Sequence, residues 1–201
     1  MIPWTTDVVY IPDVNFKAYL VDNFDADADG EISLEEAESI TDIDIMGLMP
    51  QATSLAGIEY FTNLETLNCA FNRLTSLDLS NKTKLTEVNV SNNRLTTIDV
   101  SGCTAIEIFD GSNNKLTQLD LSAAKGLTSL NVATNQLASL GVAQNKALTY
   151  LNCTGNKLPS LEVSTILGLT ELYCGKNQLQ TLNLSKNTAL TTLECNGNNL
   201  T

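Results

Sequence analysis

The sequence predicts an α+β repeat fold, a solenoid in which short and similar coils of chain stack along one axis. Two observations predict it: a leucine or isoleucine recurs every 21 residues, and an asparagine follows each of them eight positions later. A strict period this short means that each unit buries its apolar face against its neighbours. The apolar positions are Leu64, Leu85, Ile106, Leu127, Leu148, Leu169 and Leu190, and the asparagines are Asn72, Asn93, Asn114, Asn135, Asn156, Asn177 and Asn198.

Each unit opens with a short stretch that suits a parallel strand. In residues 64–69, apolar side chains alternate with polar ones, as expected for a strand with one buried face. The asparagine then turns the chain, and its amide can satisfy backbone groups left unpaired inside the coil. About ten residues remain, too few for a helix and its turns. We therefore expect a parallel β-sheet on the concave face and a mostly extended convex side, with a second short strand in some coils.

The unit that starts at Leu64 fits the leucine-rich repeat template L-x-x-L-x-L-x-x-N-x-L. Over residues 64–201 the chain resembles the nested, 21-residue leucine-rich repeats called IRREKO, which are common in bacterial surface proteins. The resemblance implies a leucine-rich repeat solenoid but says little about the ligand. We expect seven such repeats over 64–201, the last incomplete, preceded by a longer first repeat over 40–63.

Five cysteines are present, and an odd number at these spacings does not indicate a disulfide framework. Cys69, Cys153, Cys174 and Cys195 share the sixth, inward position of their units, which predicts small buried apolar side chains. A redox or metal-binding role for the stacked trio at 153, 174 and 195 stays open. Cys103 falls in a convex-side turn, so we expect it to be the most exposed thiol.

Residues 25–36 carry every defining position of an EF-hand calcium loop. Carboxylates stand at positions 1, 3 and 5, Gly30 permits the sharp turn at position 6, and a glutamate stands at position 12. Calcium is thus the predicted cofactor, since so many neighbouring carboxylates repel one another without a cation. An acidic loop that binds no metal is the alternative. The predicted ligands are Asp25, Asp27, Asp29, Glu31 through its carbonyl, Ser33 and Glu36.

Helices are expected on both sides of this loop. Asp13 suits the N-cap of the first helix, and residues 34–40 suit a short second one. Residues 1–39 would then form an EF-hand-like helical cap. Internalin-type proteins carry such a cap before first repeats similar to residues 54–64, although their caps lack a complete calcium loop. We expect the solenoid end to partner the lone loop and calcium to be structural, with a signalling switch as the alternative.

The net charge of −12 lies in the first third of the chain. Residues 1–63 carry thirteen acidic side chains and one basic one, whereas residues 64–201 carry ten of each. Without a basic stripe, nucleic acid is not an expected partner. The apolar runs are too short for membrane insertion. Residues Met1 to Trp4 do not resemble a signal peptide. We still expect a secreted or cell-surface protein, and we expect that its export signal was removed from this chain.

The sequence argues against an enzyme. It has no histidine, the most frequent general base. Glu87 and Asp110 on adjacent coils offer the one catalytic alternative, a paired-carboxylate glycosidase, but no pocket is predicted around them.

We expect a non-catalytic binding scaffold whose concave face contacts a protein at a cell surface. A glycan-binding module and a spacer are the alternatives. The outward positions hold mostly small polar side chains, and the large exceptions are the predicted partner-binding residues, with two tyrosines on adjacent coils. The final coil would also expose apolar residues, so end-to-end self-association through this end is a further expectation. The predicted partner-binding residues are Phe71, Ile108, Tyr150 and Tyr173.

Overall fold

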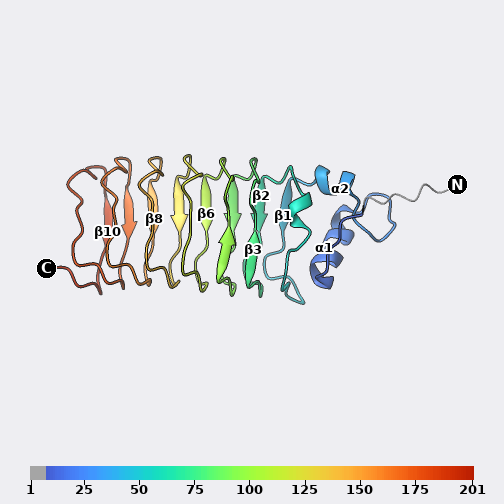
Figure 1. Ribbon diagram of the computed structural model, residues 1–201, viewed down its shortest axis with the longest axis horizontal. Coiled ribbons are helices and arrows are strands. Elements are labelled where there is room, and N and C mark those ends of the chain that lie inside the picture. Colours follow the sequence, from blue (N-terminus) through green and yellow to red (C-terminus); the bar gives the residue numbers. More distant parts are fainter. Residues whose placement is uncertain (1–7) are drawn as a thin grey trace.

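The computed structural model describes residues 8–201, so Met1 to Trp4, on which the export prediction depends, lie outside the described residues. The chain winds into stacked coils, and each contributes one three-residue strand to a parallel sheet of eight strands along one side (Figure 1). The predicted parallel-sheet solenoid is confirmed. In sheet order the strands are β1 (Asp42–Asp44), β2 (Thr66–Asn68), β4 (Glu87–Asn89), β6 (Ile108–Asp110), β7 (Ser129–Asn131), β8 (Tyr150–Asn152), β9 (Glu171–Tyr173) and β10 (Thr192–Glu194).

The opposite side of the solenoid is mostly extended chain. Two coils form a second short strand there, and β3 (Ser76–Asp78) pairs in parallel with β5 (Thr97–Asp99). A 3-10 turn, η1 (Ile58–Tyr60), lies in the first coil. The expectation of an extended convex side with a second strand in some coils is confirmed. We call this side the back face.

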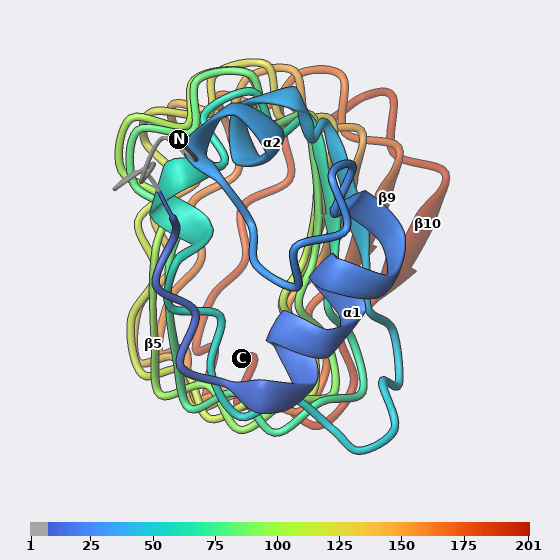
Figure 2. The ribbon, with the colours of Figure 1, turned by 90° about the vertical axis from the view of Figure 1, so that its right-hand side faces the viewer.

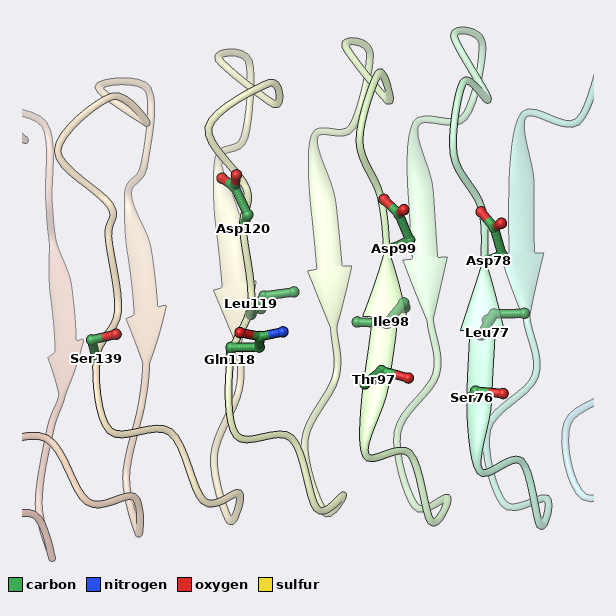
Figure 3. Close-up of a pocket in the computed structure, with 10 residues that line it drawn as sticks. All are labelled: Ser76, Leu77, Asp78, Thr97, Ile98, Asp99, Gln118, Leu119, Asp120 and Ser139. Carbon is green, nitrogen blue, oxygen red and sulfur yellow. The ribbon is translucent and has the colours of Figure 1, made fainter.

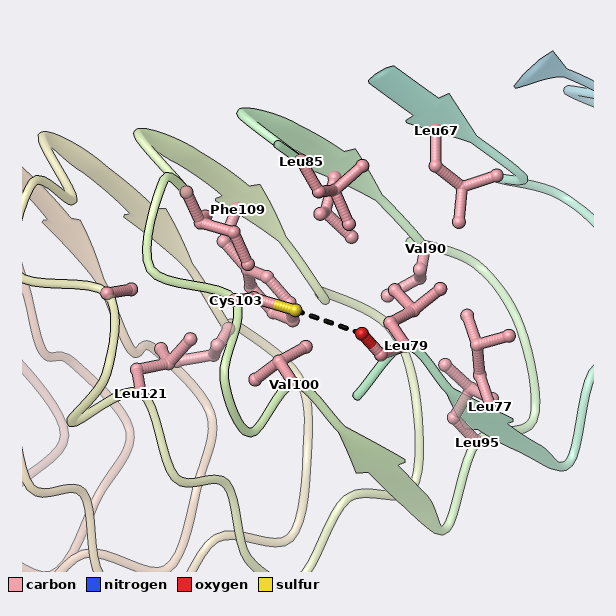
Figure 4. Close-up of a cluster of buried hydrophobic side chains, with 14 of the residues drawn as sticks. Leu67, Leu77, Leu79, Leu85, Val90, Leu95, Val100, Cys103, Phe109 and Leu121 are labelled. Carbon is pink, nitrogen blue, oxygen red and sulfur yellow. Dashed lines mark hydrogen bonds between the residues drawn. The ribbon is translucent and has the colours of Figure 1, made fainter. Parts of the chain in front are cut away.

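The core is a continuous apolar column between the sheet and the back face (Figure 4). In each strand of the eight-stranded sheet the middle side chain points inward, and Leu67, Val88 and Phe109 are all nearly inaccessible to solvent. Packing around the Phe109 ring is tight, because a Cβ added at Gly111 would lie 2.7 Å from a ring carbon. Since each strand has only three residues, burial along this column rather than strand length holds the coils together.

The repeated asparagines form the predicted ladder. Asn135 Nδ2 donates to the carbonyls of Gly111 in the preceding coil at 2.9 Å and Val132 in its own coil at 3.1 Å, while its Oδ1 accepts the Leu116 N–H at 2.9 Å. One side chain thus satisfies backbone groups in two coils, which explains why asparagine recurs at this position in all seven 21-residue repeats. Six of the seven are buried, and the last, Asn198, is partly exposed.

A second inward column with the same 21-residue spacing runs along the back turns, and it overturns the prediction for Cys103. The thiol is fully buried and donates to the Leu79 carbonyl at 3.0 Å (Figure 4). In the neighbouring coil the ammonium of Lys82 donates to the Glu59 carbonyl in the same manner. The 21-residue period therefore determines burial in the back turn as well as in the strand. The most exposed of the five cysteines is Cys195, not Cys103. The column comprises Phe61, Lys82, Cys103, Ala124, Asn145, Ile166 and Asn187, all buried.

Directly before each ladder asparagine the backbone adopts a left-handed conformation. All seven 21-residue repeats share it, with φ between 52° and 70°. Glycine and asparagine adopt this conformation at little cost, whereas Phe71 and Thr134 do so against steric strain. The positions are Phe71, Asn92, Asn113, Thr134, Gly155, Lys176 and Gly197.

Two helices cover the first coil (Figure 2). Helix α1 (Val14–Phe24) begins at the predicted N-cap Asp13, whose Oδ1 accepts the N–H groups of Asn15 and Phe16. The other oxygen of Asp13 accepts from Thr53 and Ser54, so one buried carboxylate joins the helix to the first coil. Helix α2 (Leu34–Ser39) begins with a capping box at Ser33. The two predicted helices are confirmed.

The acidic loop between these helices pairs with the chain's own N-terminal segment, not directly with the solenoid. Val9 N–H donates to the Ile32 carbonyl at 2.8 Å, and Val8 forms an antiparallel bridge with Ser33. We call residues 8–11 the strap. It packs on the turn at Gly57, where an added Cβ would lie 2.9 Å from Ile11 Cγ1. The acidic loop was expected to pair with the end of the solenoid. Instead it pairs with the strap, and the strap packs on the first coil of the solenoid.

The last coil is the most open. Leu193, the inward residue of β10, is 43% exposed, whereas the equivalent Leu172 of β9 is fully buried. Leu190 and Cys195 are partly exposed, as expected for this end. End-to-end association through these residues stays a prediction. No helix in residues 8–201 has the length and apolarity needed to span a membrane.

Candidate functional site

The outward side chains of the eight-stranded sheet form one continuous surface, which we call the strand face. Each strand presents its first and third residue there, so the face has two columns that cross the sheet in register. The first column is Asp42, Thr66, Glu87, Ile108, Ser129, Tyr150, Glu171 and Thr192, and the second is Asp44, Asn68, Asn89, Asp110, Asn131, Asn152, Tyr173 and Glu194.

The strand face carries carboxylates and no cation. Among the sixteen positions six are acidic and none is lysine or arginine. Within residues 8–201 the one salt bridge joins Lys17 to Glu31 in the cap, so no strand-face carboxylate has a cationic partner. The sequence showed a repeat body with equal numbers of both signs. That balance conceals a separation of the two signs, because the lysines and arginines of the repeats lie in the turns, whereas carboxylates stand on both the strand face and the back face.

Tyr150 and Tyr173 are neighbours on the strand face, as predicted. Their ring centroids lie 5.7 Å apart with the rings tilted by 45°. Tyr173 donates its hydroxyl to Glu171 at 2.9 Å, and this hydrogen bond raises the pKa of the tyrosine. The hydrogen bond fixes one ring of this partly exposed pair. Partly exposed aromatic side chains are frequent anchors in protein interfaces.

The other two predicted contact residues lie at different places. Ile108 is on the strand face, 42% exposed, directly opposite Glu87 of the adjacent strand. Phe71 is 47% exposed but lies beyond the end of β2, at the left-handed turn. Phe71 is therefore an outward residue, as predicted, but it does not belong to the strand face, because β2 ends at Asn68 and the chain has already turned.

A shallow groove of about 570 Å³ runs over the first half of the strand face. It is lined by carboxylates of Asp42, Asp44, Glu87 and Asp110, with Ile108 at its side. Glu87 and Asp110 do lie on adjacent strands, but diagonally, since Glu87 faces Ile108 and Asp110 faces Asn89. An open groove does not exclude water, so this pair lacks the enclosure that a glycosidase needs.

The back face has a groove of similar size, about 560 Å³, over β3 and β5 (Figure 3). Its carboxylates are Asp78, Asp99 and Asp120, one in each of three successive coils. Each accepts the N–H of the serine two residues later at 2.8–2.9 Å. Hydrogen bonds from the hydroxyl and N–H of Ser101 lower the pKa of Asp99, and those from the N–H and hydroxyl of Ser122 lower the pKa of Asp120. These side chains therefore close local turns.

The acidic loop of the cap brings three predicted metal ligands together. Carboxylate oxygens of Asp25, Asp27 and Asp29 lie within 4.8 Å of one another. Among residues 8–201 this is the one group of three or more potential ligand residues so close together, and the cysteine column forms no such group. Carboxylate oxygens are ligands that calcium prefers.

The remaining predicted ligands serve local structure as well. Glu36 accepts N–H groups of Ala26 and Ser33 through separate oxygens, at 2.7 and 2.8 Å. The Ser33 hydroxyl donates to Glu36, and the side chain of Glu31 binds Lys17 at 2.6 Å. That leaves Glu31 its backbone carbonyl, the atom predicted to bind metal. Glu36 Oε1 accepts one hydrogen bond and keeps a lone pair for a cation, whereas Oε2 accepts two from Ser33, so in this arrangement the glutamate can offer a cation one free oxygen.

The electrostatics of the loop follow from this crowding. The Gly30 N–H lowers the pKa of Asp25. For Asp27 a hydrogen bond from the Asp29 N–H acts downward, but desolvation and the neighbouring carboxylates of Asp29 and Glu36 outweigh it and raise the pKa. A bound cation would relieve that repulsion.

Comparison with known proteins agrees with the repeat. A family model described as leucine-rich repeats (2 copies) matches residues 62–102. Internalin J of Listeria monocytogenes is 36% identical over 74 residues, which cover 37% of this chain and 8% of that protein. The match thus spans a small part of the relative's length.

Solved structures share the fold. Internalin C2 of Listeria monocytogenes superposes with a TM-score of 0.80 at 23% identity, covering 94% of this chain and 86% of that one. A leucine-rich repeat protein of Leptospira interrogans gives a TM-score of 0.73 at 21% identity, covering 83% and 45%. The chain thus carries leucine-rich repeats that match the family model over residues 62–102, and it shares a leucine-rich repeat solenoid fold with internalin C2.

Proposed function

We propose that the protein is a non-catalytic scaffold that binds another protein through the strand face, at a cell surface or after secretion. The observation that carries this proposal is the open, unpartnered sheet face with the neighbouring tyrosines at 150 and 173. Aromatic side chains that are partly exposed on a rigid element lose little conformational entropy on binding, which makes them good interface anchors. The internalin-like fold supports a binding role by analogy.

Site-specific photocrosslinking tests this proposal even while the partner is unidentified. A benzophenone amino acid replaces Ser129 in the middle of the strand face or, as a control, Ser139 on the back face. We expect discrete protein adducts on intact target cells from the first position only. Adducts from both faces alike, or from the back face alone, would contradict the proposal.

A second variant pair tests the anchors. Tyr150→Ala with Tyr173→Ala should reduce the adduct yield at position 129 about tenfold or more, in the range of an interface hot spot. Tyr60→Ala is the matched control, because Tyr60 is 44% exposed on η1 and away from the strand face. Equal losses in both variants would show that the tyrosine pair has no special role.

Glycan binding is the second candidate function. The asparagines of the strand face, Asn68, Asn89, Asn131 and Asn152, stand in one column beside the tyrosine pair, and amides with aromatic rings are suited to sugar hydroxyls and sugar faces. A glycan-array signal that disappears in Tyr150→Ala would favour this function over protein binding. A spacer without a ligand would give neither array signal nor crosslinks.

We also propose that calcium binds the acidic loop and stabilises the cap. Support comes from the converging carboxylates of Asp25, Asp27 and Asp29 and from the strap, which joins the loop to the first coil. A cation in the loop would fix the ends of both cap helices and the strand bridge at Ser33. Its role would be structural, because terminal repeats need a covered face.

Melting with calcium or with a chelator tests the metal site. At free calcium about a hundred times the dissociation constant, stability should rise by about 2.7 kcal/mol. Asp25→Asn with Glu36→Gln should abolish the rise. Glu35→Gln with Glu38→Gln, two exposed changes on α2 outside the ligand set, should retain it. An unchanged melting midpoint in the unmodified protein would refute structural calcium.

A further inference from the structure

The strand face has the shape of a ribbon. Each strand is three residues long, so the face is about 10 Å wide, whereas seven strand spacings make it about 34 Å long. A surface of these proportions offers a single extended chain a continuous track across the strands. It offers a broad globular surface little contact area.

The charge along this ribbon has one sign from end to end. Carboxylates stand on β1, β4 and β6 at one end and on β9 and β10 at the other, and none is paired with a cation of the described chain. The lysines and arginines of the repeats lie in the turns, outside every strand. Unneutralised carboxylates on a groove favour a cationic partner and disfavour an acidic one.

Apolar side chains are interleaved with these carboxylates. Ile108 faces Glu87 across adjacent strands, and Tyr173 lies beside Glu171. A lysine or arginine has the matching chemistry, because its aliphatic stem can lie on an apolar side chain while its charged end reaches a carboxylate. Arginine can also stack on an aromatic ring such as Tyr150.

From these observations we propose that the strand face binds an extended segment of a partner protein that is rich in lysine or arginine. Between β1 and β9 lie six strand spacings, about 29 Å, which an extended chain covers with about nine residues. Cationic side chains should contact the carboxylates of Asp44, Glu87 and Asp110 in the groove and of Glu171 beyond it. This inference rests on the proposed function, since it names the chemistry of the partner at the same surface.

Selection from a phage-displayed library of random linear peptides of about this length tests the proposal, with the full chain as bait at low salt. We expect enriched peptides with an excess of lysine and arginine. Their affinity as labelled synthetic peptides should fall as salt rises, because exposed charge pairs are screened.

Matched isosteric variants locate the interaction. Asp44→Asn, Glu87→Gln and Asp110→Asn together should weaken the selected peptides about tenfold. The control carries Asp78→Asn, Asp99→Asn and Asp120→Asn, which remove the same charge from the back face. The asparagines introduced in both can still accept the turn N–H two residues later, so both variants should fold.

The outcomes separate the two proposals. Neutral or acidic peptides whose binding depends on Tyr150 would overturn the cationic partner but leave binding at the strand face intact. Peptides indifferent to Tyr150 and to the strand-face carboxylates would overturn both. A library without any enrichment would count against an extended segment, whereas the crosslinking result would still decide the proposed function.

Discussion

At the scale of single residues, the left-handed backbone conformation before each ladder asparagine is adopted by residue types with very different preferences for it. The left-handed turn position holds asparagine or glycine in four coils, but Phe71, Thr134 and Lys176 in the others. A β-branched side chain such as threonine is the least suited, because its Cβ substituents clash with the backbone in this region. The fold therefore imposes strain of about 1–2 kcal/mol at Thr134.

We predict that Thr134→Asn stabilises the protein by about 1 kcal/mol, since asparagine adopts this conformation readily and is the residue of two equivalent positions. Urea unfolding measures the change. Thr117→Asn is the control, an exposed threonine with ordinary backbone, and it should change little. Equal effects at both positions would mean that left-handed strain does not limit stability here.

The cysteines give a second prediction at this scale. Burial raises the pKa of Cys69 to about 12 and that of Cys174 to about 11. An unfolded thiol ionises near pH 8.5, so the folded state binds these protons more tightly. Their contribution is fully present below that pH and is lost as the pH rises toward the folded values.

Unfolding free energy should thus decline progressively from about pH 8.5 to 11. Replacing Cys69 and Cys174 with alanine should flatten that slope, whatever it does to stability at neutral pH. A slope that is the same with and without these thiols would show that the buried thiols do not cause alkaline destabilisation.

Most of the repeat could be predicted from the sequence because the period reports directly on burial. The ladder asparagines, the strand positions and the neighbouring tyrosines at 150 and 173 all follow from their place in the 21-residue unit. Cys103 was mispredicted because its column mixes lysine, cysteine, alanine and isoleucine, so no common chemistry marks it as inward. The strap and the left-handed turn depend on backbone geometry, which a pattern of side-chain types does not encode.

At the scale of elements, the ladder does what three-residue strands cannot do alone. Every ladder asparagine donates to a carbonyl of the preceding coil and accepts an N–H from it, so neighbouring turns share one network. The back-face column reproduces this only in part. Asn145 and Asn187 donate to two carbonyls each, but their buried Oδ1 atoms accept nothing. The front turns are therefore the stronger cross-links between coils.

Asn135→Ala should therefore cost about 3 kcal/mol, because it leaves the buried Leu116 N–H without a partner and removes one of the two hydrogen bonds that the Gly111 carbonyl accepts. Asn198→Ala is the matched control. Asn198 makes the same contacts in the last coil, but it is partly exposed and water can replace them, so about 1 kcal/mol is expected. Chemical denaturation of both variants measures the difference. Equal losses would contradict a burial-dependent ladder.

At the scale of the whole molecule, each coil contacts only its neighbours. The loss of stability caused by a local defect should therefore decrease with distance along the solenoid. The strap connects the cap to the solenoid by packing on one turn, at Gly57. There Gly57 has φ of 101° and leaves no space for a side chain, since a Cβ would lie 2.9 Å from Ile11 Cγ1 and from the Tyr10 carbonyl. Gly47 also has a positive φ, 62°, but nothing lies within 4 Å of an added Cβ.

Alanine substitutions at Gly57 and Gly47 distinguish the cost of backbone strain from the cost of displacing the strap. Gly57→Ala should destabilise by about 2–3 kcal/mol, because strain and a backbone clash act together, whereas Gly47→Ala should cost about 1 kcal/mol from strain alone. Hydrogen exchange should show the loss in Gly57→Ala concentrated in the cap and the first coil and fading toward β7, with β9 unaffected. Uniform loss across all eight strands would mean that the solenoid unfolds as one cooperative unit. The cap would then stabilise every coil, and the acidic loop would influence the distant tyrosines as strongly as the strand next to it.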